Sequence, residues 1–357
     1  MTAEVLYKFP HAQQIVKLTQ YTSEPETFSS FEELNGKEGF VIAPFAIDDA
    51  HPIVLIHPEK EVVMGTKDET NDVCYTNNVA DKSIRSPQLY RKSYQKNFKC
   101  FHAQLIAHQF DKIVLARSQD MEIGSNLSNE KIFRKACMQY PEMSVILVST
   151  KVTGTWLMAT PEVLLTGEGT TWHTMALAGT MKISVDKSNS WSDKNKHEQQ
   201  IVAKYIHQCL MPFTENINET TPHTVHAGNL IHLRSDFTFT LRDSYTLGTL
   251  LGYLHPTPAV CGLPKQKAQQ FIIEHEHTKR AYYSGFVGLL HPLGKTYLYV
   301  SLRCMQILPN CYRLYAGGGL LEDSVEQQEW EETVAKMETM EKTFSSPLTL
   351  PNREESN

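Results

Sequence analysis

The sequence lacks the features that mark several large classes of protein. It has no apolar run of membrane-spanning length, its N-terminus has no basic and then apolar leader, and its seven cysteines include no CxxC pair. An odd number of cysteines fits reduced thiols, so we expect a cytoplasmic protein without a disulfide framework. Because no apolar run is long enough to span a membrane, we also expect no membrane partner. A net charge of −6 over 357 residues gives no electrostatic footprint for nucleic acid.

Internal repeats, low-complexity tracts and obvious linkers are also missing. Short β-branched runs bounded by proline predict strands at 39–46 and 52–58, and apolar residues between 94 and 105 recur with the spacing of an amphipathic helix. Further strands are predicted at 111–117, 144–149, 154–160, 228–243 and 294–308, and a long helix from about 192 to 210. Because these elements come in mixed groups without regular βαβ alternation, we predict an α+β fold with largely antiparallel sheet.

We expect the chain to form one fold with three stretches. Residues 1–88 are predicted to make a small N-terminal lobe that is part of the same fold, with a polar loop from Lys67 to Asp81. Residues 89–346 are predicted to be the catalytic region, and residues 347–357 a polar tail. The N-terminal lobe carries no residue pattern to which we can assign chemistry.

The most informative stretch is "YAGGGLLEDSVEQQEWEETVAKM" at 315–337, in which three glycines precede an acidic segment. We interpret the glycines as a turn. Ser324 and Gln327 have capping-box spacing, which predicts that a helix starts directly after the glycines. Trp330, Val334 and Met337 would then share the apolar side of that helix.

Glu329, Glu332 and Lys336 form a neighbouring stripe on the same predicted helix. They fit a solvated acidic face near the positive end of the helix dipole. They also fit a ligand site, because glycines let backbone N–H groups approach an anion closely. An anion held beside carboxylates needs a cation between them, and oxygen ligands of this kind suit Mg²⁺.

Two further charged residues interrupt apolar patterns. Glu198 extends the apolar stripe of its helix formed by Val202, Tyr205 and Cys209, where a charge is costly unless it is paired, bound to metal or exposed beyond the core. Lys112 alternates with apolar residues on a strand, where it fits the protection of a sheet edge. A lysine held among apolar groups can alternatively have a lowered pKa and act as a general base.

Other candidates are weaker in isolation. Glu162 follows a proline at the start of a short strand and fits a turn, whereas Arg303 lies in the middle of a predicted strand and calls for a carboxylate partner. Tyr283 fits either the core or a ligand contact. The segment "EHEH" at 274–277, with His255 upstream, could be taken for a zinc site, but no further ligand stands at a telling distance.

Taken in order, nine motifs resemble the chorismate-utilising enzymes and, within them, the isochorismate synthases. They are "DKIVLAR", "TPEVLL", "LAGT", "KNKHEQQIV", "GNLIHL", "LHPTPAVCGLP", "RAYYSGFVG", "SLR" and "YAGGG…EWEET…K", which run from about residue 90 to residue 344. The resemblance implies two packed antiparallel sheets with helices outside and an active site in the cleft between them. The chain departs from the family where Met181 and Lys182 follow "LAGT" in place of an arginine.

The resemblance also implies roles for individual residues. Lys112 falls where family members that add a hydroxyl carry the general base, and Glu162 matches the general acid. Glu198 and Glu332 match the Mg²⁺ ligands, with Glu329 close to the metal. The positions that match substrate-binding residues are Gly179, Thr180, His232, Tyr283, Arg303, Gly317, Gly319 and Lys336.

The function implied is the Mg²⁺-dependent conversion of chorismate to isochorismate, for menaquinone or siderophore biosynthesis, by a monomer that needs no amidotransferase partner. Members that add ammonia typically carry glutamine in place of Lys112. A salicylate synthase, which goes on to eliminate pyruvate, would carry the same residues, although "HPTPAVCG" is more similar to isochorismate synthases. A chorismate-binding protein without catalysis is the alternative of another class, and it would have no need of Lys112 and Glu162 together.

Overall fold

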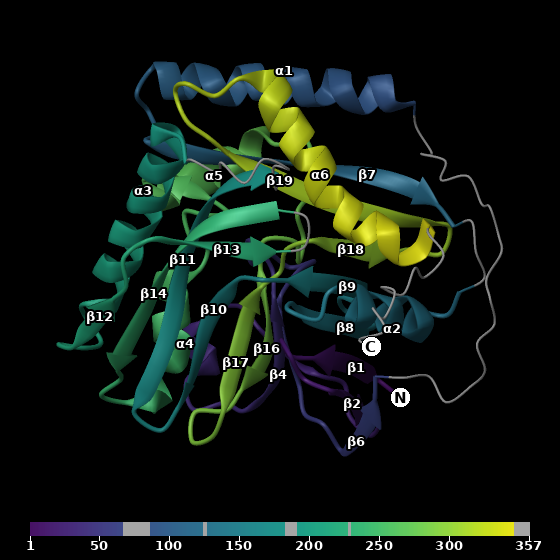
Figure 1. Cartoon of the computed structure of the whole chain (residues 1–357). Coiled ribbons are helices and arrows are strands. Elements are labelled where there is room, and N and C mark those ends of the chain that lie inside the picture. The colour runs from purple at the N-terminus through teal and green to yellow at the C-terminus, as the bar shows by residue number, and fades with distance from the viewer. Residues whose placement is uncertain (67–85, 124–126, 183–190, 228–229, 346–357) are drawn as a thin grey trace, which may run out of the picture.

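A computed structural model describes residues 1–66, 86–123, 127–182, 191–227 and 230–345 of the chain. Two large sheets are packed against each other, and every strand pair in the described residues is antiparallel (Figure 1). This confirms the predicted fold class. Within the described residues, no helix combines the length and the apolar character needed to cross a membrane.

We call the nine-stranded sheet sheet A and the ten-stranded sheet sheet B. Sheet A has the order β15 (Gly262–Leu263), β7 (Lys112–Glu122), β19 (Cys311–Leu320), β18 (Cys304–Ile307), β9 (Gly154–Thr160), β8 (Ser144–Thr150), β1 (Ala3–Lys8), β2 (Gln14–Gln20) and β6 (Lys60–Gly65). Sheet B has the order β12 (Ile217–Glu219), β14 (Leu230–Thr240), β11 (Thr171–Lys182), β10 (Val163–Glu168), β17 (Thr296–Val300), β16 (Phe286–Leu290), β4 (Gly39–Ala43), β5 (Ile53–Ile56) and β3 (Glu26–Phe28), with β13 (His223–Ala227) paired to β14.

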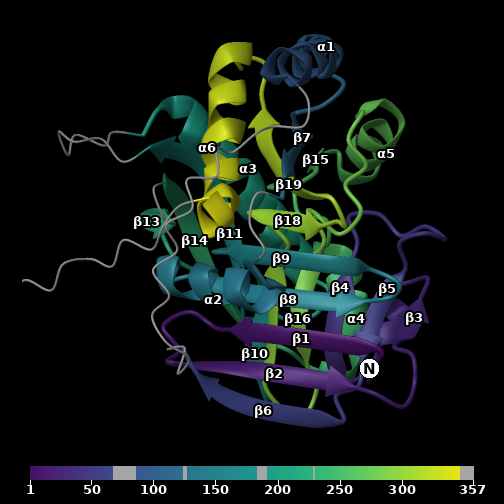
Figure 2. The same ribbon diagram turned by 90° about the vertical axis from the view of Figure 1, so that its right-hand side faces the viewer.

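Helices cover the outer face of each sheet. Sheet A carries α1 (Pro87–Ile106), α2 (Asn129–Gln139), α5 (Lys265–His275) and α6 (Glu326–Ser345). Sheet B carries α3 (Asp193–Leu210) and α4 (Leu247–Leu254). Figure 2 shows the strands of sheet A as a ladder, with α2 in front of it and α1 and α6 near its far end.

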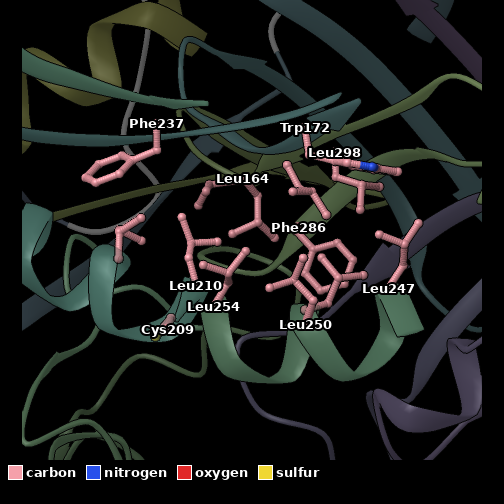
Figure 3. Close-up of a cluster of buried hydrophobic side chains, with 14 of the residues drawn as sticks. Leu164, Trp172, Cys209, Leu210, Phe237, Leu247, Leu250, Leu254, Phe286 and Leu298 are labelled. Carbon is pink, nitrogen blue, oxygen red and sulfur yellow. The ribbon is translucent and has the colours of Figure 1, made fainter. Parts of the chain in front are cut away.

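Apolar side chains fill the spaces between these layers. Between the sheets, Trp156 of β9 packs in one cluster with Phe40 of β4 and Tyr299 of β17. A second cluster lies between sheet B and its helices, where Trp172 and Phe237 meet the leucines of α4 (Figure 3). The cores therefore lie on both faces of each sheet, which holds the sheets and helices at fixed positions around any site between them.

The helix patterns in the sequence predicted the helices well. The apolar spacing between 94 and 105 belongs to α1, in which Tyr94, Phe98, Phe101 and Leu105 are buried. The helix predicted from about 192 begins one residue later, because the Ser192 side chain accepts a hydrogen bond from Asn195 N and caps it. The strands predicted between 39 and 160 are also present.

Two predictions about strands near the C-terminus were wrong. The run 294–308 is two strands, because β17 ends at Val300 in sheet B and β18 begins at Cys304 in sheet A. Arg303 therefore lies between strands, with a positive φ of 44°. The three glycines form no turn, since Gly317 to Gly319 belong to β19 and pair with β7.

The N-terminal strands are built into both sheets. β1, β2 and β6 extend sheet A, while β3, β4 and β5 extend sheet B. The division at residue 88 stays a prediction. The loop predicted at 67–81 and the tail predicted at 347–357 lie outside the described residues.

Candidate active site

Two of the places where the chain passes from one sheet to the other lie next to each other. Each of these two crossings carries a candidate residue. Residues 160–162 lead from β9 to β10, and residues 301–303 lead from β17 to β18. Thr160 Oγ1 donates to Val300 O at 2.7 Å, and Val300 N donates to Glu162 O at 2.9 Å. Ala159 N donates to Arg303 O at 3.1 Å. These hydrogen bonds lock the crossings together and hold Glu162 and Arg303 close to one cavity.

That cavity lies between the sheets and gathers most of the predicted site. All the candidate residues line it except Lys112 and Glu329. The candidates that line it are Glu162, Gly179, Thr180, Glu198, His232, Tyr283, Arg303, Gly317, Gly319, Glu332 and Lys336. Residues from β11, β14, α3, β19 and α6 thus converge, as the sequence predicted for a cleft between two sheets.

Glu162 is not the exposed turn glutamate that its sequence context alone would suggest. Its exposed fraction is 3%, and its backbone lies just before β10. Burial raises the pKa of its carboxyl to about 8, although the positive charges of Lys112, Lys336 and Arg303 work in the opposite direction. Glu162 is therefore protonated at neutral pH and can donate a proton into the cavity.

Arg303 is positioned by His232 and not by the carboxylate that the sequence led us to expect. The ring of His232 lies 3.0 Å from Gly179 O through Nδ1, so the proton is on Nδ1 and Nε2 accepts from Arg303 Nη2 at 3.0 Å. Burial, reinforced by the charge of Arg303, holds the pKa of His232 well below its usual range. The remaining partner of the guanidinium in the described residues is Thr339 Oγ1 at 3.3 Å, which leaves donors for an anionic ligand.

A bulge in β11 places the loop residues against this histidine. The register of β11 with β14 shifts between Ala178 and Thr180, and Gly179 between them has a φ of +69°. A side chain at Gly179 would be strained in this conformation and would crowd Asn195 of α3. Because of the bulge, Gly179 O points to His232 Nδ1, and both Gly179 and Thr180 face the cavity.

The side chain of Lys112 lies next to the glycines of β19. It is fully buried, and β7 is flanked by β15 and β19, so the interpretation as protection of a sheet edge is wrong. A methyl group on Gly319 would lie 2.6 Å from Lys112 Cε and 3.2 Å from its Nζ, and it would also collide with Glu198. The missing side chain at Gly319 therefore leaves room for this lysine and this glutamate beside the cavity. On the neighbouring glycine, Gly317, a methyl group would lie 2.9 Å from the hydroxyl oxygen of Tyr283.

Each of the three predicted metal ligands is paired with its own lysine. Glu198 Oε1 lies 2.8 Å from Lys112 Nζ, and Glu332 Oε1 lies 2.6 Å from Lys336 Nζ. Glu329 Oε1 lies 2.7 Å from the Nζ of Lys194, which belongs to the first turn of α3 and was missed in the sequence. Its signal was the spacing of four residues to Glu198, which puts both side chains on one helix face.

The acidic stripe of α6 faces inward. The exposed fraction of Glu329 is 3%, whereas Val334, which we assigned to the apolar side, is 39% exposed. Ser324 does not form the predicted capping box with Gln327, because its hydroxyl accepts from Leu321 N and donates to Glu329. The interpretation as a solvated face is therefore wrong for this helix.

The two most buried of these carboxylates have opposite pKa shifts. Burial works to raise the pKa of Glu198, but the charge of Lys112 and its hydrogen bond outweigh burial and hold the pKa below its usual value. Burial and the negative charge of Glu332 raise the pKa of Glu329, against the effect of Lys194. The crowding of Glu329 and Glu332 means that a further cation near them would be favourable.

The donor chemistry of this cluster fits Mg²⁺. A methyl group on Gly318 would lie 3.1 Å from Glu329 Oε2 and 3.7 Å from Glu332 Oε1, so two carboxylates approach each other over a glycine that leaves them room. Oxygen donors of this kind suit a hard divalent ion. In the described residues no three histidine, cysteine or acidic side chains are grouped so that they could bind a metal ion. Each of the three carboxylates instead forms an ion pair with a lysine. A metal would therefore take the place of lysine contacts.

The structure gives the segment considered for zinc other roles. His255 is buried, and its Nε2 donates to Pro44 O at 3.0 Å. Burial lowers the pKa of His255 to about 3. Glu276 forms an ion pair with Arg280, and His275 stacks on Phe271.

The remaining wall of the cavity is mostly apolar and could not be singled out in the sequence. Tyr315 stacks on Tyr283 with ring centroids 5.4 Å apart, and burial raises the pKa of Tyr283 well above its usual value. The other wall residues are Val114, Pro161, Leu177, Ala178, Ala259, Val260, Leu302 and Ala316. A cavity with an apolar wall and a few convergent charged groups is typical of a site for a small anionic molecule.

Comparison with known proteins gives a consistent family. A family model described as "Chorismate binding enzyme" matches residues 48–345. The isochorismate synthase EntC of Escherichia coli K12 is 30% identical over 245 residues, which cover 66% of this chain and 63% of that protein. This chain thus spans less than two thirds of the length of that relative. The isochorismate synthase DhbC of Bacillus subtilis is 27% identical over 320 residues, covering 85% of this chain and 77% of that protein.

A solved structure has the same fold. It is a putative 2,3-dihydroxybenzoate-specific isochorismate synthase, DhbC, from Bacillus anthracis, with a TM-score of 0.81 and 23% sequence identity. The superposition covers 96% of this chain and 96% of that chain. The likeness extends over both sheets, including the N-terminal strands.

Proposed function

The chain belongs to the chorismate binding enzyme family, and from that premise we propose that it is an isochorismate synthase, which isomerises chorismate to isochorismate with Mg²⁺. The observation that carries this proposal is the combination of Glu162, which lines the cavity, with Lys112, which is buried beside it. Glu162 is buried and protonated, and the charge of Lys112 acts on it. A protein that only bound chorismate would have no use for a carboxylic acid and an amine placed together in this way.

The proposed reaction exchanges one hydroxyl group for another. Lys112 in its neutral form takes a proton from a water molecule as the oxygen attacks C2 of the ring. The double bonds shift, the C4–O bond breaks, and Glu162 gives its proton to the departing hydroxyl, which leaves as water. One water enters and one leaves, so the product is an isomer of the substrate.

Substrate binding is assigned to the residues that surround the acid and the base. Chorismate carries two carboxylates. Arg303, oriented by His232, has free donors for one of them, next to Tyr283 and the backbone of Gly317 and Gly319. Lys336, which donates to Gly317 O at 2.9 Å, can bind the other.

Glu198 and Glu332 would hold Mg²⁺, with Glu329 beside them. The ion would neutralise these carboxylates and anchor a substrate carboxylate that they would otherwise repel. Lys112 would then lose its partner Glu198, which lies 2.8 Å from its Nζ. Its release from this ion pair gives the lysine the freedom that a general base needs.

The test is to incubate the purified protein with chorismate, with and without Mg²⁺, and to follow the products by NMR while released pyruvate is assayed. Isochorismate that forms only with Mg²⁺ and without pyruvate is the expected result. Pyruvate together with salicylate would identify a salicylate synthase that uses the same residues. Binding of chorismate without turnover would contradict the catalytic proposal.

We also propose that the enzyme acts as a monomer in the cytoplasm, without an amidotransferase, and supplies isochorismate to menaquinone or siderophore biosynthesis. The lysine at position 112 supports the independence from an ammonia donor. Sedimentation of the purified protein would test the monomer.

A further inference from the structure

In the part of the chain that the structure describes, one edge of β7 has no partner strand where it borders the cavity. The partner on that side, β15, is two residues long and ends opposite Ile113, and one more hydrogen bond joins Val114 N to Cys261 O at 2.7 Å. The residues before Cys261 are not part of the sheet, and Ala259 and Val260 line the cavity instead.

Two side chains form hydrogen bonds with backbone groups of β7 that have no strand partner on this edge. Glu276 Oε1 accepts from Ala116 N at 2.6 Å, and Arg280 Nη2 donates to Val114 O at 2.9 Å. Arg280 Nη1 also donates to Val260 O at 2.7 Å, on the segment that departs from the sheet. The two side chains bind each other through Nε and Oε2 at 2.6 Å and through Nη2 and Oε1 at 2.7 Å.

The pair is fully enclosed, which makes its presence informative. The side chains of Arg280 and Glu276 are 2% and 1% exposed. Removing two charges from water is unfavourable, and a buried ion pair is by itself weak evidence of a stabilising contact. A buried backbone group without a hydrogen-bond partner is also unfavourable. The rigid fork of donors on arginine, next to a carboxylate acceptor, matches the alternating donors and acceptors that a strand would present.

The same pair reaches a third part of the cavity wall. Tyr283 N donates to Arg280 O at 2.9 Å, in the turn that brings Tyr283 to the cavity. Val114, Val260 and Tyr283 come from separate segments, and all three are tied to Glu276 or Arg280. Neither member of the pair lines the cavity.

We infer that Glu276 and Arg280 are positioning residues, which take the place of a strand at the edge of β7 and fix the cavity wall against which the substrate lies. The effect on the substrate rests on the proposed function. This assigns a role to Glu276, whose "EHEH" segment had suggested only zinc.

The test compares Arg280→Lys and Glu276→Gln with a second carboxylate–arginine pair, one member of which lies on β7. Asp120 of β7 and Arg313 of β19 form a bidentate ion pair, at 2.7 and 2.9 Å, away from the cavity. Asp120→Asn and Arg313→Lys are therefore the controls. For each variant, the dissociation constant of chorismate is measured by calorimetry, thermal unfolding by circular dichroism, and hydrogen exchange by mass spectrometry.

Lysine keeps the charge of Arg280 but cannot reach Val114 O, Val260 O and Glu276 together. We expect Arg280→Lys to weaken chorismate binding by about 10-fold to 100-fold, which is the order of loss when buried hydrogen-bonding groups at a binding wall are left without partners. Exchange should accelerate in peptides covering 112–117 and 257–263. The controls should lower thermal stability without either effect. Glu276→Gln keeps an acceptor for Ala116 N, so it should fold and show a smaller effect in the same direction.

Equal loss of affinity in Arg280→Lys and Arg313→Lys would overturn the inference, because it would mean that general destabilisation is responsible. Unchanged exchange in both wall peptides would overturn it as well. If the wild-type protein binds chorismate without converting it, the proposed function fails and the binding comparison still decides this inference. If the wild-type protein does not bind chorismate, the exchange measurement decides it alone.

Discussion

Glu162 holds its proton at neutral pH because its carboxyl is enclosed between the two sheet crossings. In the folded protein burial raises its pKa to about 8, from an ordinary value of 4.5. The folded state therefore keeps a proton that the unfolded chain has lost between these pH values. The contribution of Glu162 to stability is complete below pH 4.5 and declines as the pH rises to about 8.

The variant Glu162→Gln should not show this decline, because its amide is neutral throughout. The free energy of unfolding of the variant, relative to the wild type, should increase between pH 4.5 and 8 and then level off. One pKa unit corresponds to about 1.4 kcal/mol, so the gain should reach several kcal/mol. Urea unfolding at a series of pH values measures it. Glu168→Gln, at an exposed carboxyl at the end of β10, is the control for the substitution itself.

The acid and the base should each be indispensable for turnover. Lys112→Gln and Glu162→Gln remove proton transfer and should lower kcat by roughly 10²–10⁴-fold, with little change in chorismate affinity. Lys204→Gln, on the exposed side of α3, should behave like the wild type. Steady-state isochorismate formation and calorimetric binding measure the two quantities. Near-normal turnover in either catalytic variant would contradict its assigned role.

At this scale, the sequence predicted which residues lie around one cavity better than it predicted their contacts. Lys112 and Glu198 stood out because charges interrupted apolar patterns, and the structure buries both as a pair. The surroundings of Arg303 were not predictable, since its partner His232 lies 71 residues away on another strand. Glu276 and Arg280 have no signal beyond a spacing of four residues, which is common on surfaces.

At the scale of elements, the ion pair of Lys194 with Glu329 joins α3 to α6. Of the contacts between elements, it is the one that a bound metal would affect most. Lys194→Met would leave Glu329 buried beside Glu332 without a cation. We expect the metal-free variant to lose about 1–3 kcal/mol of stability, less than the roughly 3–5 kcal/mol of a fully buried pair, because the lysine side chain is 23% exposed.

Mg²⁺ should bind this variant more tightly than the wild type, since a competing positive charge is gone, and should restore much of the stability. Lys196→Met is the matched control, because Lys196 pairs with Asp193 on the outer face of the same helix. Calorimetry with Mg²⁺ and thermal unfolding with and without the ion measure both effects. Equal Mg²⁺ affinity in the two variants would argue against a metal at Glu329.

The elements were predicted where one pattern fits one structure. Helix α1 has clear periodicity and strand β8 is a short apolar run, and both were found. The glycines of β19 misled us because glycine is common in turns, whereas here it makes room for side chains from β7 and α3 within a paired strand. The run 294–308 misled us because its strand pattern continues across the crossing between sheets.

The whole molecule depends on its first strands. β1 pairs with β8 in sheet A, and β4 pairs with β16 in sheet B. A fragment of residues 87–357 would expose both of these edges together with the apolar face around Trp156. We expect this fragment to be aggregated or without cooperative unfolding, as measured by circular dichroism and sedimentation.

Co-expression of residues 1–66 should recover soluble protein, because those strands can pair with the exposed edges. A monomeric fragment 87–357 that unfolds cooperatively would show instead that the N-terminal strands are a separable lobe. The fold class followed from the mixture of elements and from the resemblance. The order of strands could not be derived from sequence patterns, because pairing between distant strands leaves no local signal.

The pairing of β4 with β16 also sets a schedule for the newly made chain. Val41 lies opposite Gly288, which is synthesised about 250 residues later. At roughly 5–20 residues per second, the partner strand follows after roughly 10–50 s. During that interval two of the most apolar strands, β4 and β5, are outside the ribosome without the sheet that will bury them. We therefore expect this early segment to need shielding until β16 has been translated, and the yield of folded protein to depend on the supply of chaperones.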